Sequence, residues 1–278
     1  MYVISLKKAI DRRSKLITKL ERMRANYSFV DAIDGSEPNV LDQTYSFILD
    51  HEVINYEARP SLKPITPPEI ACTISHVKAI RSAYLEQQSG VWILEDDADF
   101  LCEDLSLISK FLDLAPKNAS YIQFQLLPSN TIARLFSRFQ EGKIFFEEKL
   151  KSPSVSFADL RLNNFQCHGT TAYFITRLGM DNIVGNILSD GRLRFPCRPD
   201  QLYLNRNLLA DRYIYWAASD DLHPGYALRI PLIASTASDS FLHEGHVAGQ
   251  SHARLTAVQI YNKLFDDGIY ELLPTTSN

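Results

Sequence analysis

Residues 91–100 read VWILEDDADF, and this stretch decides the fold expected for the rest of the chain. Four apolar residues run directly into four carboxylates within five positions. A continuous apolar run entered after Gly90 predicts a strand covered on both faces of a sheet. Carboxylates this close repel one another unless a cation or hydrogen-bond donors offset their charge. The stretch therefore predicts a cation site at the end of a buried strand, and its alternative is an acidic turn that caps a helix beginning near Glu103.

The segments before this stretch predict a β-α-β order. Residues 2–6 (YVISL) and 27–32 (YSFVDA) are typical of strands, and residues 9–24 carry an apolar face typical of a helix. Thr66 and Glu69 form a capping-box pattern that predicts a helix start, with prolines tolerated in the first turn. This order predicts an α/β fold with a mostly parallel, Rossmann-type sheet and helices on both faces.

The downstream pattern is less regular, and residues 36–65 show weak periodicity. We expect further helices at residues 104–114, 177–188, 199–209 and 255–265. We expect strands at residues 121–126, 171–175 and 213–217, and a hairpin or loop region at 138–156 with a strand at 143–146.

Composition limits the classes of protein to which the chain can belong. Its 278 residues are 45% hydrophobic and 22% charged, as in an ordinary globular protein, and its net charge of −4 argues against a nucleic-acid binder. No signal peptide is visible and no apolar run approaches the ~20 residues that span a bilayer, so we expect a cytoplasmic protein. The cysteines show no zinc-finger spacing and are expected to be reduced, buried thiols.

Three polar stretches are expected to meet at one edge of the sheet, because ligands collect at the carboxyl ends of parallel strands. They are Ser5 with Leu6, residues 31–35, and residues 95–97. Hard carboxylate oxygens there suit Mg²⁺ or Mn²⁺, and such an ion can bridge the phosphates of a nucleotide.

Basic and histidine side chains near this edge are ambiguous. Arg12 and Arg13 lie in the first turn of a helix, where positive charge is unfavourable, so they either bind phosphate or are solvated or paired with Asp11. His76 lies between apolar positions and is more typical of a hydrogen-bonded core residue than of a catalyst.

The order of four motifs resembles that of glycosyltransferase family 25, the lipooligosaccharide-biosynthesis glycosyltransferases, whose relatives include the collagen galactosyltransferases. The motifs are residues 3–6 with 11–13, residues 30–35, residues 66–76 running on to 92–97, and residues 169–176 with Pro199 and Asp200 downstream. The chain departs from the family pattern at Pro68, at Ala71 and around Asp200.

The resemblance implies an enzyme with a GT-A-like fold. It implies transfer of a hexose, typically galactose from UDP-galactose, with inversion at the anomeric carbon. It implies a metal ion, Mn²⁺ or Mg²⁺. It also implies a donor-binding region at residues 1–130 and an acceptor-binding region at residues 131–278, both within one continuous domain.

The resemblance also implies roles for individual residues. Asp97 would be a direct metal ligand, and Asp96 and Glu95 would contact metal, ribose or donor sugar. The residues expected to line the uridine pocket are Ser5, Leu6, Asp34 and Gly35. Further nucleotide or phosphate contacts are expected from Arg13, Ser75, His76 and Lys78. Asp200 is the first choice for the general base, with Glu69 and His168 behind it.

The expected partners are a UDP-sugar donor and an oligosaccharide or lipid-linked saccharide acceptor. A group of arginines indicates either surface charge or contact with an acidic saccharide or anionic lipid, which would allow peripheral association with the cytoplasmic face of the inner membrane; they are Arg192, Arg194, Arg198, Arg206 and Arg212. Two other functions stay open: a metal-dependent nucleotide-sugar hydrolase, and a catalytically silent nucleotide-sugar binder.

Overall fold

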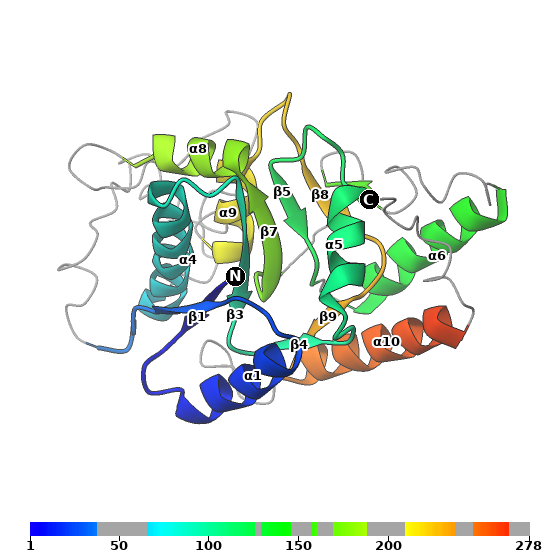
Figure 1. Ribbon diagram of the computed structural model, residues 1–278, viewed down its shortest axis with the longest axis horizontal. Coiled ribbons are helices and arrows are strands. Elements are labelled where there is room, and N and C mark those ends of the chain that lie inside the picture. The colour runs from blue at the N-terminus through cyan, green and yellow to red at the C-terminus, as the bar shows by residue number, and fades with distance from the viewer. Residues whose placement is uncertain are drawn as a thin grey trace, which may run out of the picture.

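The computed structural model describes residues 1–37, 66–125, 129–145, 157–160, 169–187, 209–236 and 247–266 (Figure 1). The expected irregular segment after Glu37 lies outside these residues, and so does the expected helix at 199–209 apart from Leu209, which precedes the helix at 210–218. No helix in the described ranges is both long and apolar enough to cross a membrane.

A seven-stranded mixed sheet forms the centre of the molecule, in the order β2-β1-β3-β7-β5-β8-β6. Parallel pairing joins β1 to β2 and β3, and β5 to β8, whereas β7 is antiparallel to β3 and β5 and β6 is antiparallel to β8. Most strands therefore point the same way, which confirms the expected α/β class. The strands are β1 (Tyr2–Ser5), β2 (Ser28–Asp31), β3 (Gly90–Glu95), β5 (Tyr121–Gln123), β6 (Phe157–Asp159), β7 (Ala172–Thr176) and β8 (Gly225–Leu228).

A second, two-stranded sheet begins inside the acidic run. Its strands are β4 (Ala98–Phe100) and β9 (Ile233–Ser235), which pair antiparallel with Ala98 opposite Ser235. The chain therefore leaves the main sheet at Glu95, crosses Asp96 and Asp97, and enters a new strand at once. Neither β4 nor β9 was predicted from the sequence.

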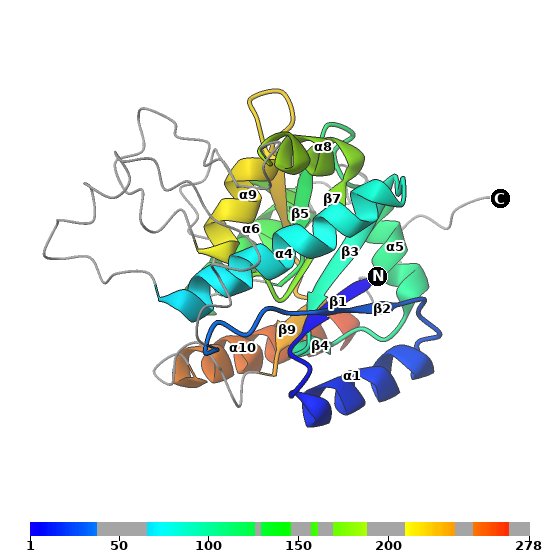
Figure 2. The same ribbon diagram turned by 90° about the vertical axis from the view of Figure 1, so that its left-hand side faces the viewer.

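Helices surround the sheet. Figure 1 shows α4, α8 and α9 to the left of β7 and β5, α5 and α6 to the right of them, and α1 and α10 below, and Figure 2 shows α4 in front of β3. The helix α4 packs on β1, β2 and β3 and against α8 and α9, and α10 packs on α6 and β9. The helices are α1 (Ile10–Arg22), α4 (Pro67–Leu85), α5 (Leu105–Asp113), α6 (Ser129–Phe145), α8 (Arg177–Gly185), α9 (Ala210–Ala218) and α10 (Val247–Asp266).

Two sequence predictions about secondary structure are wrong. The expected strand at 213–217 is the helix α9, whose buried residues Tyr213, Ile214 and Ala217 recur at helical spacing and face its neighbouring helices. The strand expected at 143–146 and the hairpin expected from residue 138 are not found as far as residue 145, because α6 continues to Phe145. The helix α6 packs along α10. In α9, helix–helix packing outweighs the local preference of β-branched and aromatic residues for strands.

Candidate functional site

The first feature of the site is the edge at which β1, β2 and β3 end. Ser5 lies opposite Asp31, and Ile4 lies opposite Glu95, so the carboxyl ends of the three strands are side by side. The Ser5 hydroxyl is buried and donates a hydrogen bond of 2.6 Å to Oδ2 of Asp96. The expected meeting of the Ser5, Asp31 and Glu95–Asp96 stretches is thus confirmed. Leu6 continues from Ser5 into the turn before α1, where its carbonyl accepts from the Ala9 N–H.

The carboxylates of the acidic run turn to different neighbours rather than to one another. Asp96 also pairs with Arg12, whose Nη1 lies 2.9 Å from its Oδ1. Oε1 of Glu95 accepts a 2.5 Å hydrogen bond from Thr170 and lies 3.3 Å from Nε2 of His76. Cations and donors of the protein itself therefore offset much of the negative charge that the sequence brings together.

Asp97 is the carboxylate with the least compensation. Its Oδ2 accepts a 2.6 Å hydrogen bond from Ser235 of β9, whereas its Oδ1 is buried and has no hydrogen-bond partner in the described part of the chain. Burial and the charge of Glu95 raise the pKa of Asp97 to about 7, with Ser235 opposing the rise and Asp96 adding to it. A buried carboxylate oxygen without a donor is the atom that a bound cation would satisfy.

Asp99 is the last carboxylate of the run and, unlike Asp97, it is paired with two cationic side chains. Lys19 Nζ of α1 lies 2.6 Å from its Oδ1, and Arg254 Nη2 of α10 lies 2.7 Å from its Oδ2. Burial raises the pKa of Asp99, but the hydrogen bonds from Lys19 and Arg254 outweigh this and hold it below its usual value. Asp99 therefore connects β4 to two helices.

The arginines in the first turn of α1 bind carboxylates at the sheet edge. Arg13 donates to the Ser5 carbonyl at 2.8 Å and to Oδ1 of Asp31 at 2.8 Å, and its guanidinium lies 4.9 Å from the centre of the Phe29 ring. The partners of Arg12 and Arg13 thus come from the strand ends, not from the adjacent Asp11 that the sequence offered as the alternative. This pairing explains why positive charge is tolerated at a helix N-terminus.

The loop after β2 is held against α4. Ser75 Oγ is buried, accepts a 2.9 Å hydrogen bond from the Ile33 N–H, and Lys78 Nζ donates to the Asp31 carbonyl at 2.9 Å. Asp34 pairs with Lys8 and accepts from the Ser36 hydroxyl at 2.6 Å. These predicted nucleotide contacts therefore also fix the conformation of the loop beside the edge.

Gly35 is required by close packing of this loop. A Cβ added to Gly35 would lie 2.5 Å from Cα of Pro68 and 2.6 Å from the Pro67 carbonyl oxygen, both at the beginning of α4. Any larger residue would push the loop away from the helix and from the site.

The comparisons with known proteins show the family of the chain. The model of glycosyltransferase family 25 (LPS biosynthesis protein) matches residues 1–189, which is more than half of the chain. The chain belongs to glycosyltransferase family 25. Every element described above that forms the strand edge, from β1 to β3, lies within the matched residues.

Two curated relatives of this family-25 chain are similar over shorter stretches. Procollagen galactosyltransferase 2 of Homo sapiens is 25% identical over 114 residues, covering 41% of this chain and 18% of the human protein. "Probable inactive glycosyltransferase 25 family member 3" of Bos taurus is 29% identical over 101 residues, covering 36% of this chain and 16% of the bovine protein. The chain thus matches less than a fifth of the length of either relative.

Of the three candidates for the general base in this family-25 chain, only Glu69 lies in the described residues. Asp200 and His168 lie outside the described residues, so their roles stay predictions. Oε2 of Glu69 accepts hydrogen bonds from the Thr66 N–H at 2.7 Å and from the Thr66 hydroxyl at 2.9 Å, which confirms its predicted part in starting α4. This capping contact gives Glu69 a structural role whether or not it also acts in catalysis.

Sequence reasoning missed several residues of the site. Ser235 lies in β9, and a single serine gives no motif. Thr170 lies just before β7 and within the fourth family motif, but it was given no role. Cys72 was interpreted only as a buried thiol, yet its sulfur, a ring nitrogen of His76 and an oxygen of Glu95 all lie within 4.8 Å of one another. The four-residue spacing of Cys72 and His76, which places both on one helix face, was the signal that could have found this cluster.

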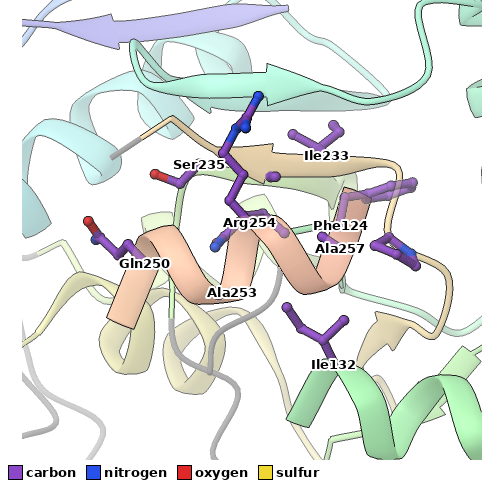
Figure 3. A pocket seen from close by; sticks show the side chains of 11 residues that line it. Phe124, Ile132, Ile233, Ser235, Gln250, Ala253, Arg254 and Ala257 are labelled. Carbon is purple, nitrogen blue, oxygen red and sulfur yellow. The ribbon is translucent and has the colours of Figure 1, made fainter. Parts of the chain in front are cut away.

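A pocket adjoins the site at Ser235, which lines the pocket and donates to Asp97. Its walls come from β9, α6, α10 and the residues after β5, and most of the lining side chains are apolar (Figure 3). The polar members are Gln125, Ser235, Gln250 and Arg254. Figure 3 also shows Arg254 extending from α10 past β9, in agreement with its ion pair to Asp99. The apolar lining supplies few of the polar groups that orient a saccharide, so the strand edge is the stronger candidate for the active site.

Proposed function

We propose that the chain is an inverting hexosyltransferase of the GT-A type. It transfers galactose from UDP-galactose to a saccharide acceptor of lipooligosaccharide or lipopolysaccharide. The family match supports glycosyl transfer, the printed name of the human relative supports galactose, and the family description supports a lipopolysaccharide acceptor. The reaction takes place at the edge formed by β1, β2 and β3.

The observation that carries the proposal is the buried Oδ1 of Asp97, in the turn between β3 and β4, which has no hydrogen-bond partner among the described residues. A divalent ion such as Mn²⁺ or Mg²⁺ fits this atom, because hard cations prefer carboxylate oxygens. Asp97 would hold the ion directly, and Asp96 and Glu95 lie next to it in the chain. When bound, the ion would neutralise negative charge on the leaving diphosphate.

Side chains of the protein would bind the donor, stabilise the leaving group and remove the acceptor proton. Ser5, Leu6, Asp34 and Gly35 would line the place where the uridine binds. Arg12 and Arg13 bring positive charge to the same edge, where the leaving UDP gains negative charge. Asp200, as the proposed general base, would remove the proton from the acceptor hydroxyl while the new glycosidic bond forms.

A silent nucleotide-sugar binder is the second candidate, and the printed name of the bovine relative favours it. The proposed enzyme and the binder both hold UDP, but only the enzyme consumes the donor. A nucleotide-sugar hydrolase would instead release free sugar without an acceptor.

A donor screen followed by mass spectrometry of the products tests the proposal. The purified chain is incubated with lipooligosaccharide fragments and UDP-galactose, UDP-glucose or N-acetylhexosamine donors, with and without Mn²⁺. The expected result is one added hexose from UDP-galactose, dependent on metal and acceptor. UDP binding without any product would support the binder, and free galactose released without acceptor would support the hydrolase.

The proposed setting is the cytoplasmic face of the inner membrane, with peripheral association through basic side chains. Arg212 lies in α9, and the other arginines of the group lie outside the described residues. Co-sedimentation with anionic vesicles, compared with neutral ones, tests this association, and equal sedimentation with both would contradict it.

A further inference from the structure

The side-chain cluster of Cys72, His76 and Glu95 has no part in the function proposed above beyond the use of Glu95. Cys72 and His76 are four positions apart on α4 and so lie on one face of that helix. Glu95 ends β3, on which α4 packs. One potential ligand atom from each residue lies within 4.8 Å of the other two.

His76 is the central observation. Its side chain is wholly buried, and its Nδ1 lies 3.0 Å from the hydroxyl of Tyr173 on β7. Its Nε2 lies 3.3 Å from Oε1 of Glu95, yet it makes no hydrogen bond in the part of the chain that the structure describes. A buried ring nitrogen without such a bond is uncommon, and this one points into the cluster.

The hydrogen bond on the other side of the ring sets the form of the imidazole. If Nδ1 carries the proton and donates to the Tyr173 oxygen, Nε2 carries the lone pair and faces Glu95. Histidines that bind metals are held in this way, with the distal nitrogen donating to a fixed acceptor. Thr170, which donates to Oε1 of Glu95, orients the carboxylate in a similar manner.

We propose that Cys72, His76 and Glu95 bind a divalent transition-metal ion, with Zn²⁺ as the best match. A thiolate, an imidazole and a carboxylate together suit a borderline-soft ion, whereas Mg²⁺ and Mn²⁺ prefer oxygen ligands. Three protein ligands leave a fourth position for water or another oxygen ligand. The thiol proton of Cys72 goes to solvent on binding, because the thiolate is the ligand.

The dimensions of the cluster fit this ion after a small contraction. Bond lengths of about 2.0–2.3 Å in a tetrahedral zinc site place the ligand atoms roughly 3.5 Å apart. The observed limit of 4.8 Å requires the side chains to move by about an ångström, which rotation of Cys72 and Glu95 can supply.

Titration of the full chain with Co²⁺, in the absence of nucleotide, tests the site. Cobalt reports a thiolate ligand through a sulfur-to-metal charge-transfer band in the near ultraviolet, and Zn²⁺ should displace it. We expect one equivalent of Co²⁺ with this band. The Cys72→Ser variant should lose the band and bind Zn²⁺ at least about 100-fold more weakly.

Cys102 offers the matched control, because it is also a free cysteine but lies beside β4, away from the cluster. The Cys102→Ser variant should keep the band and the Zn²⁺ affinity. Absence of the band in the wild-type chain, or its persistence in Cys72→Ser, would overturn the proposal and leave His76 as a residue that positions Glu95.

The outcome is independent of the proposed transferase activity, since the titration contains neither donor nor acceptor. A chain that binds Co²⁺ through Cys72 but transfers no sugar would support the site and contradict the proposed function. A chain that transfers sugar but shows no cobalt band would support the proposed function and contradict the metal site.

Discussion

Asp97 and Asp99 are two positions apart, but the structure places them in opposite electrostatic surroundings. Asp99 pairs with Lys19 and Arg254, and these contacts hold its pKa below the usual value. Asp97 has a serine for one oxygen and no donor for the other in the described residues, and its pKa rises to about 7. An acidic run is therefore not one site, because neighbours distant in sequence decide what each carboxylate does.

Replacing Asp97 should have the largest effect on activity. We expect Asp97→Asn to reduce transfer by at least about 10³-fold, because a bound metal ion contributes several kcal/mol of charge stabilisation. Asp96→Ala should also abolish transfer, since it removes the partner of Arg12 and Ser5 at the same edge. Initial rates with UDP-galactose and calorimetric titration with UDP and Mn²⁺ measure these effects.

The control for this experiment is Asp99→Asn, measured below its melting temperature. It removes the same charge from the same run but should keep transfer within a few-fold of wild type. If Asp97→Asn keeps the wild-type rate, the acidic run is only structural and the comparison between the two residues has no catalytic meaning.

Replacing Asp200 should separate turnover from donor binding. We expect Asp200→Asn to lower kcat by ~10²–10⁴-fold, because the amide keeps the shape of the carboxylate but cannot accept the proton. UDP affinity should change little, unlike in Asp97→Asn. A near-normal kcat would remove Asp200 from the mechanism and direct attention to Glu69 and His168.

For stability, in contrast to activity, replacing Asp99 should have a larger effect than replacing Asp97. Asp99→Asn should lower the free energy of unfolding by up to about 3 kcal/mol, because it leaves the partly buried Lys19 with only the longer 3.8 Å contact to Glu103 as a counter-charge. Asp97→Asn should leave the metal-free protein as stable as wild type or more stable, since it removes repulsion from Glu95. Urea denaturation of both variants measures this difference, and equal losses would contradict the contrast.

The pH dependence of stability follows from the same pKa shifts. The raised folded-state pKa of Asp97 means that its contribution is present at low pH and is lost as the pH rises towards about 7. The lowered pKa of Asp99 has the opposite sign, so its contribution is lost as the pH falls through its folded-state pKa.

Thermal melts of the metal-free proteins between pH 4 and pH 8 test both signs. As the pH rises, the melting temperature of Asp97→Asn should increase relative to that of the wild type by roughly a few degrees. As the pH falls, the difference in melting temperature between the wild type and Asp99→Asn should become smaller. Parallel curves for both variants would show that neither shift is linked to folding.

The smallest effect is expected at Glu69. Glu69→Ala removes the contacts with Thr66 that begin α4 and should lower the free energy of unfolding by about 1 kcal/mol. Transfer should be unchanged, in contrast to Asp200→Asn. A loss of kcat without a loss of stability would instead support Glu69 as the general base.

The sequence predicted the first part of the fold well because the signals there are local. The helix start at Thr66, the helix that Asp104 caps and the strand entered after Gly90 all depend on residues within a few positions. The parallel pairing of β1 with β2 and β3 followed from their β-α-β order, and it placed Ser5 beside the acidic run.

The rest could not be predicted because it depends on contacts between distant segments. β4 exists because β9 pairs with it from more than a hundred residues away, and α9 is a helix because α4 and α8 bury its face. The charge of Asp99 is offset by Lys19 and Arg254, which no local pattern connects to it. The sequence therefore located the acidic edge but could not distinguish its members.

The position of β7 has a consequence for how the chain acquires its structure. This strand pairs with β3 on one side and β5 on the other, although it follows both in the chain. During synthesis, β3 and β5 therefore emerge with open hydrogen-bonding edges and stay open until the ribosome has passed Thr176. A chain stopped near residue 130 would expose both edges, so nascent and truncated forms should depend on chaperones and aggregate more readily than the finished protein.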